Sequence, residues 1–169
     1  IGDIITQMRQ ACLYLWQRSG RRMLVYGHSA GGHLAACMVA TDWSDIDSTV
    51  PADLTAVGAA ISGLFDLTPL RSVSMNSDLR LAGEEEARRV SPLFWDVGPG
   101  RTLDVVVGGL ESGEFLRQSR EIAERWRARG AATRYLEVPG GNHFTALDPF
   151  ADPDSSYSRR LAELAALTA

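Results

Sequence analysis

The chain has 169 residues, of which 45% are hydrophobic and 22% are charged, and its formal net charge is −4. This composition is typical of a globular protein that is long enough to bury a core. Basic and acidic residues are interspersed, as in the stretch 117–129, so no cationic face for nucleic acid is predicted. No apolar run approaches the roughly 18 residues that a membrane span needs, so no membrane partner is expected either.

The two cysteines, Cys12 and Cys37, fall on apolar helical faces without metal-ligand spacing. We expect two reduced thiols in the core, no metal and no cofactor, and a cytoplasmic location. The first residue is Ile1 and the chain opens at once on a helical pattern, so we expect a preceding segment, which would hold any targeting signal.

Helical and strand-like patterns alternate along the chain. Apolar residues at helical spacing predict a first helix that stops at Ser19–Gly20, followed by a strand that ends at Tyr26. The remaining predicted elements are a helix to about Thr41, a strand over 56–61, an irregular segment over 63–99 with short helical pieces, a strand over 103–107, a helix over 115–129, a strand over 133–138 and a helix over 155–167. This order predicts an α/β fold with a mostly parallel sheet covered by helices on both faces. No repeat or linker divides the chain, so a single domain over 1–169 is predicted.

The pentapeptide Gly27-His28-Ser29-Ala30-Gly31 lies between the first predicted strand and the following helix. In this strand-turn-helix setting the pattern predicts a nucleophile elbow, in which the flanking glycines permit a sharp turn and the serine hydroxyl stays exposed. The helix N-terminus supplies amides for a developing oxyanion, and Ala30, directly after the serine, provides one of them.

Parallel sheets place their chemistry in the loops at the carboxyl ends of the strands, and three such loops hold candidate catalytic residues. Ser29 follows the first strand, Glu111 the third and His143 the fourth. We interpret Ser29 as the nucleophile, His143 as its general base and Glu111 as the acid that orients the imidazole.

Each assignment has alternatives. His28 and His33 are the other histidines, although their places within the elbow and its helix favour packing or capping. Asp66 is a rival acid because it too follows a strand. Two further acids fit less well, because Asp104 lies at the wrong end of its strand and Glu114 lies where the next helix begins.

Five stretches carry a family resemblance: 27–35, 62–70, 91–93, 111–119 and 142–144. On these residues the chain resembles the α/β-hydrolase superfamily, and within it the kynurenine formamidase (arylformamidase) group, over nearly its whole length. The resemblance implies an α/β-hydrolase fold and places the triad acid on Glu111. The family often has aspartate there, so glutamate is a departure.

The resemblance also implies a small cap-like insertion around 64–99, with Asp66 as a structural or pocket-shaping residue. His28, Phe144 and Leu67 are the residues we expect at the substrate. The family's other oxyanion donors come from a glycine-rich loop on an earlier strand, which is not found here outside the elbow. We therefore expect the N-terminal strands of the sheet, with that loop, to precede Ile1.

These observations predict a metal-independent serine hydrolase of arylformamidase type, which converts N-formylkynurenine to kynurenine and formate through an acyl-enzyme. A carboxylesterase acting on short acyl esters is the alternative, because substrate choice depends on cap side chains that the sequence does not position. A non-catalytic binding protein of the same fold is a third hypothesis, which an intact triad disfavours. The expected partner is a small ester or amide; a homodimer is compatible with the sequence, which does not fix the oligomeric state.

Overall fold

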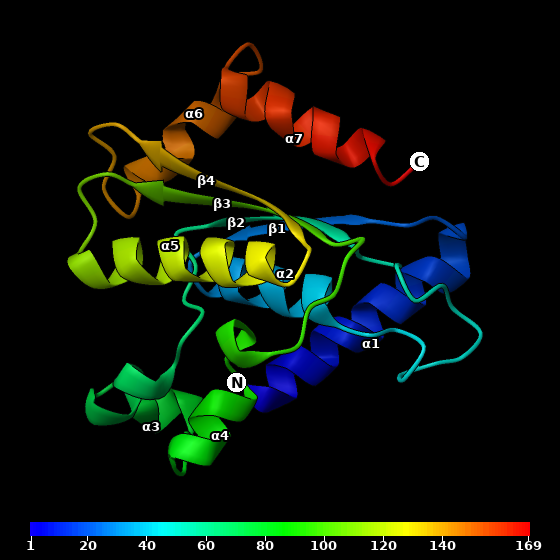
Figure 1. The fold of residues 1–169 in the computed structure, drawn as a ribbon, viewed down its shortest axis with the longest axis horizontal. Coiled ribbons are helices and arrows are strands. Elements are labelled where there is room, and N and C mark those ends of the chain that lie inside the picture. Colours follow the sequence, from blue (N-terminus) through cyan, green and yellow to red (C-terminus); the bar gives the residue numbers. More distant parts are fainter.

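The computed structural model describes residues 1–169, in which helices and strands alternate as predicted (Figure 1). The strands are β1 (Leu24–His28), β2 (Val57–Ile61), β3 (Thr102–Gly108) and β4 (Ala132–Val138). The α-helices are α1 (Gly2–Ser19), α2 (Ala30–Ala40), α3 (Asn76–Leu79), α4 (Glu84–Arg89), α5 (Gly113–Ala128), α6 (Asp148–Ala151) and α7 (Ser156–Ala166). Short 3-10 helices are η1 (Thr68–Ser72), η2 (Pro92–Phe94) and η3 (Thr145–Leu147). The sequence did not predict α6, and it ended the first strand two residues before His28.

The four strands form one parallel sheet in the order β1-β2-β3-β4. His28 at the end of β1 pairs with Ile61, and Ile61 pairs with Val106. Because neighbouring strands run in the same direction, the loops that follow them emerge at one edge of the sheet. This register brings the loops that hold Ser29, Glu111 and His143 together.

Helices cover both faces of the sheet, which confirms the predicted architecture. Figure 1 shows α1, α2 and α5 on one face and α6 and α7 on the other. Between the sheet and the first group lies a core cluster whose largest members are Trp126, Phe65, Leu103 and Ile122. At about 25 cal/mol per Å² of apolar surface removed from water, this burial is the main source of stability.

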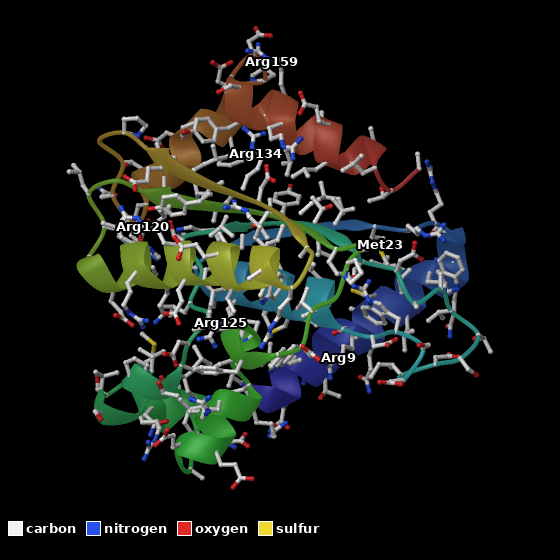
Figure 2. All side chains as sticks on the ribbon, viewed as in Figure 1. Arg9, Met23, Arg120, Arg125, Arg134 and Arg159 are labelled. Carbon is white, nitrogen blue, oxygen red and sulfur yellow. The ribbon has the colours of Figure 1, made fainter.

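One buried ion pair fixes α7 to the sheet. Asp104 on β3 is 2% exposed, and Arg160 reaches its two carboxylate oxygens at 2.7 and 3.2 Å. A buried carboxylate without a partner is strongly destabilising, so this pair constrains where α7 lies. Among the other arginines labelled in Figure 2, Arg120 of α5 pairs with Glu137 of β4, and Arg125 of α5 lies over the ring of Phe94.

The segment over 64–99, predicted as a cap-like insertion, contains η1, α3, α4 and η2. Leu67, Leu81 and Val90 from this segment join Ile5 and Cys12 of α1 in a second core cluster. Much of the segment therefore packs against α1, and whether it also closes over a substrate stays a prediction.

The edge of β1 has no strand beside it, because β1 pairs with β2 alone. Tyr26, in the middle of β1, is 61% exposed. The expectation that earlier strands lie along this edge stays a prediction.

Candidate active site

The turn between β1 and α2 holds Ser29 in an unusual backbone conformation. Its φ is 56° and its ψ is −118°, a region that residues other than glycine rarely adopt. A Cβ on Gly27 would lie 2.5 Å from backbone atoms of Gly31, and one on Gly32 would lie 2.9 Å from the carbonyl oxygen of Ile61. A Cβ on Gly31 meets nothing within 4 Å. The tight turn therefore requires glycine at 27 and 32, whereas the sequence interpretation had assigned this requirement to 27 and 31.

The structure brings the three predicted catalytic residues into one hydrogen-bonded chain. The Nε2 atom of His143 lies 3.0 Å from the hydroxyl oxygen of Ser29, and its Nδ1 lies 2.8 Å from Oε2 of Glu111. A carboxylate only accepts, so Nδ1 carries the proton and Nε2 is left to accept from the serine. This is the geometry of a serine nucleophile, a general base and an orienting acid.

The carboxylate of Glu111 is almost completely buried, with a side chain that is 1% exposed. Its Oε1 accepts a hydrogen bond from the amide of Gly108 at 2.8 Å and another from the hydroxyl of Ser62 at 2.5 Å. Sequence reasoning did not single out Ser62. The available signal was its position, directly after β2 at the same sheet edge as the triad.

The loop that carries His143 is supported from β1. The Nε2 atom of His28 lies 2.7 Å from the carbonyl oxygen of His143, and because a carbonyl only accepts, His28 is the donor. The centroids of the two imidazole rings are 4.6 Å apart. The ring of Phe115, which belongs to α5, packs against His143 with a centroid distance of 4.8 Å. His28 thus holds the backbone of the candidate base, and its predicted contact with substrate stays a prediction.

His33 is buried in α2 and does not face Ser29. It is 2% exposed, and its Nδ1 donates to the carbonyl oxygen of Leu64 at 2.7 Å. Burial lowers the pKa of His33 to about 4, so the ring is neutral at physiological pH. It links α2 to the loop after β2, which agrees with the packing role expected for it.

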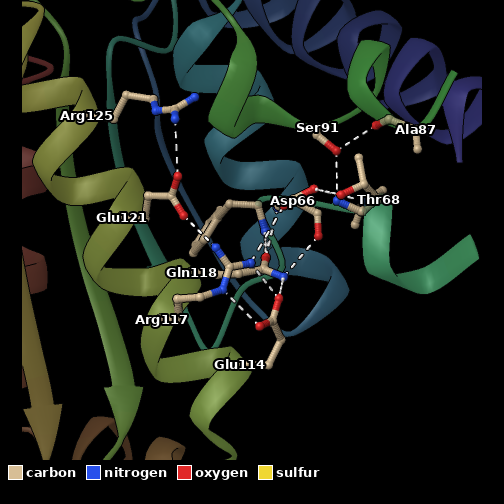
Figure 3. Close-up of polar contacts among 11 residues, drawn as sticks. Asp66, Thr68, Ala87, Ser91, Glu114, Arg117, Gln118, Glu121 and Arg125 are labelled. Atoms are coloured by element: carbon tan, nitrogen blue, oxygen red, sulfur yellow. Dashed lines mark hydrogen bonds and ion pairs between the residues drawn. The ribbon is translucent and has the colours of Figure 1, made fainter. Parts of the chain in front are cut away.

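The rival acid Asp66 belongs to a different polar network (Figure 3). Its Oδ1 accepts from the amide and the hydroxyl of Thr68 at 2.9 and 2.6 Å, and Arg117 lies 3.6 Å from its Oδ2. Glu114 pairs with the same arginine, whose hydrogen bonds hold the pKa of Glu114 below its usual range. Neither carboxylate contacts His143.

Two of the residues expected at the substrate occupy contrasting places. Leu67 is 2% exposed and belongs to the second core cluster, so the structure gives it a packing role, and its contact with a substrate stays a prediction. Phe144 is 77% exposed, with its ring edge-on to His143 at 5.6 Å. A hollow of about 380 Å³ opens there, lined by Leu110, Glu111, Ser112, Phe115, Asn142, His143 and Phe144.

Ala30 is the first residue of α2, and the first amides of a helix have no acceptor within it. Its N–H is therefore available next to the hydroxyl of Ser29, where an oxyanion would form.

No group of three or more His, Cys, Asp or Glu side chains lies close enough together to hold a metal ion. None of the helices is long and apolar enough to cross a bilayer.

Solved structures of hydrolases share this arrangement of strands and helices. A proposed thioesterase from Silicibacter sp. TM1040 matches with a TM-score of 0.71 and 29% identity, over 96% of this chain and 58% of that one. Thermogutta terrifontis esterase 2 matches with a TM-score of 0.69 and 20% identity, over 96% of this chain and 62% of that one. The chain therefore has an α/β-hydrolase fold.

Within that class the sequence resembles kynurenine formamidases. The enzyme of that name from Salmo salar is 30% identical over 171 residues, and the one from Danio rerio is 28% identical over 169 residues. Each alignment covers 95% of this chain, which spans 56% of the length of either relative. No protein-family model matches the chain. The resemblance to the kynurenine formamidase and esterase group that the motifs indicated is thereby confirmed.

The steric role of the elbow glycines is testable with two alanine substitutions. We expect Gly27→Ala to abolish turnover and active-site labelling, because its Cβ would displace the first turn of α2 and with it Ser29. Gly31→Ala is the matched control and should keep both, since its Cβ enters open space. Equal losses in the two variants, measured with a fluorophosphonate probe and steady-state kinetics, would contradict the assignment.

Proposed function

We propose that the chain carries the reacting residues of a serine hydrolase that cleaves a small amide or ester through an acyl-enzyme. The observation that supports this most directly is the hydrogen-bonded chain from Ser29 through His143 to the buried carboxylate of Glu111. Neutral His143 takes the proton of Ser29 as its oxygen attacks the substrate carbonyl. Glu111 stabilises the imidazolium that results, and the amide of Ala30 donates to the oxyanion.

The second half of the reaction uses the same residues. The imidazolium of His143 gives its proton to the departing amine or alcohol, which leaves the acyl group on Ser29. A water molecule then attacks the acyl carbon while His143 accepts its proton. The bond to Ser29 breaks as the imidazolium returns that proton to the serine oxygen, and the carboxylic acid product departs. Burial of the carboxylate strengthens its attraction to the imidazolium, because the surrounding dielectric is low.

We propose a small N-formyl arylamine such as N-formylkynurenine as the substrate. Formyl transfer to Ser29 releases the arylamine, and hydrolysis of the formyl-enzyme releases formate. The similarity to kynurenine formamidases supports this choice. The exposed ring of Phe144 beside His143 supports it too, because the aromatic leaving group departs on the side of the base that protonates it.

A carboxylesterase acting on short acyl esters is the second candidate, and the similarity to Thermogutta terrifontis esterase 2 supports it. The two candidates use the same residues and differ in the leaving group. We further propose a cytoplasmic location, which the buried and unpaired thiols of Cys12 and Cys37 support. Burial raises the pKa of Cys12 to about 11, so this thiol stays protonated and unreactive.

Rates measured side by side on N-formylkynurenine and p-nitrophenyl acetate separate the candidates. We expect the full-length protein to have the higher kcat/KM on the formamide, although an amide is intrinsically less reactive than an aryl ester. Turnover of the ester alone would identify the carboxylesterase, and turnover of neither substrate, with no probe labelling, would favour a binding protein.

The nucleophile is tested by removing its hydroxyl. Ser29→Ala should abolish labelling by a fluorophosphonate and turnover without loss of the fold, because the side chain is partly exposed and packs little. His143→Ala should act similarly, since a serine hydroxyl is a weak nucleophile without its base. Ser44→Ala, at an exposed serine in the loop after α2, is the matched control and should remain active. Covalent labelling that persists in Ser29→Ala would refute the nucleophile.

The acid is tested by an isosteric change. Glu111→Gln should lower kcat by about 10⁴-fold, the loss known for the corresponding change in a serine protease, because an amide cannot stabilise the imidazolium and favours the wrong tautomer. Asp66→Asn is the control; it should cost far less in kcat and should lower stability, because Asp66 holds Thr68 and faces Arg117. The reverse pattern would move the acid to the loop after β2.

A further inference from the structure

Ser62 is a buried serine whose backbone lies in a conformation that suits glycine. It is 0% exposed and its φ is 48°. Side chains at such a φ are strained, and glycine adopts it without a Cβ penalty. Its amide donates to the carbonyl oxygen of Val106 at 2.7 Å, which fixes the backbone to β3. Because glycine would form this turn with less strain, the serine hydroxyl is expected to contribute an interaction of its own.

The hydroxyl of Ser62 points to the candidate catalytic acid. It donates to Oε1 of Glu111 at 2.5 Å, across 49 positions in the chain. The other donor to Oε1 is the amide of Gly108, the last residue of β3, which leads directly into the loop of Glu111. Ser62 directly follows β2, so it is the one donor to Oε1 that comes from a different part of the sheet.

The two oxygens of Glu111 have separate partners. With Oε1 occupied by the hydroxyl and the amide, Oε2 is the oxygen that faces Nδ1 of His143. A glutamate has one more rotatable bond than an aspartate, so its carboxylate has more orientations to lose before it points at the imidazole. A donor at the end of the neighbouring strand β2, itself fixed to β3 through its amide, removes that freedom.

We propose that Ser62 is a positioning residue for the hydrolytic reaction, which acts by fixing the carboxylate of Glu111 against His143. This proposal rests on the proposed function. Ser62 touches neither Ser29 nor the substrate in the mechanism above. Its effect is expected in kcat, through the orientation of the base, and not in substrate binding.

The test compares two variants of Ser62 in the full-length protein. Ser62→Ala removes the hydroxyl and keeps the Cβ, whereas Ser62→Gly removes the hydroxyl and also relieves the backbone strain. We expect both to lower kcat on the best substrate by roughly 10- to 100-fold, the scale of a misoriented catalytic group, with little change in KM. Ser62→Gly should unfold at the same or a higher temperature than Ser62→Ala, because it relieves the strain. A loss of kcat in Ser62→Gly then cannot be attributed to a loss of stability.

Ser91 supplies the matched control. It is also 0% exposed, and its hydroxyl donates to the carbonyl oxygen of Ala87 and accepts from the amide of Leu67, away from the triad (Figure 3). Ser91→Ala should lower the melting temperature and leave kcat unchanged. If Ser62→Gly keeps the kcat of the parent protein, the hydroxyl does not position the acid and the proposal is overturned.

A double-mutant cycle with Glu111→Gln tests whether Ser62 acts through the acid. In the Glu111→Gln background we expect Ser62→Ala to lower kcat by less than about threefold, because the carboxylate it positions is already gone. The full loss of the single variant, repeated in that background, would overturn the proposal. The proposed function fails separately, if Glu111→Gln and Ser29→Ala themselves keep full activity.

Discussion

The close approach of β1 to the first turn of α2 is the constraint on which the rest of the site depends. Backbone atoms of Gly31 lie only 2.5 Å from where a Cβ of residue 27 would be, because the chain turns sharply between β1 and α2. The residue between these two elements is Ser29, which takes a strained φ of 56°. Its amide donates to the carbonyl oxygen of Ile61 at 2.8 Å, so the strained turn is held by the neighbouring strand. Packing elsewhere must offset this strain, and the buried core on α2 and α5 is where the stabilisation arises.

The parallel pairing of the strands then brings residues that are distant in the sequence close together. The loops after β1, β3 and β4 emerge at one edge, so residues more than a hundred positions apart in the chain, such as Ser29 and His143, meet at 3.0 Å. The two partners of the His143–Glu111 contact differ in exposure: the side chain of Glu111 is 1% exposed, whereas that of His143 is 28% exposed. The imidazole of His143 is therefore open to the surface, while the carboxylate that it contacts stays out of water.

The local sequence was sufficient to predict the strands, the long helices and the three residues that the structure joins in one hydrogen-bonded chain, because hydrophobic period and strand-end position are local properties. It was insufficient for the partners that support the triad. Ser62 meets Glu111 across 49 positions and His28 meets the carbonyl of His143 across 115, and neither contact leaves a pattern near either residue. The packing of Leu67 in the second core cluster was equally hidden, since an apolar residue that follows a strand has the same local pattern in a core and beside a substrate.

The buried side chain of Gln118 helps to position the loop of Glu111 relative to the loop after β2. Gln118 of α5 is 1% exposed, and its Oε1 accepts from the amides of Phe65 and Asp66 at 2.7 and 2.8 Å. Buried amides left without acceptors are costly, so this bond fixes the start of α5 against the loop after β2. Glu111 lies just before α5, and Ser62 is the first residue of that loop. Two contacts therefore join α5 and its preceding residues to the loop after β2: Gln118 with the amides of Phe65 and Asp66, and Glu111 with the hydroxyl of Ser62. The first contact fixes the distance between helix and loop, and so brings Ser62 within reach of Glu111.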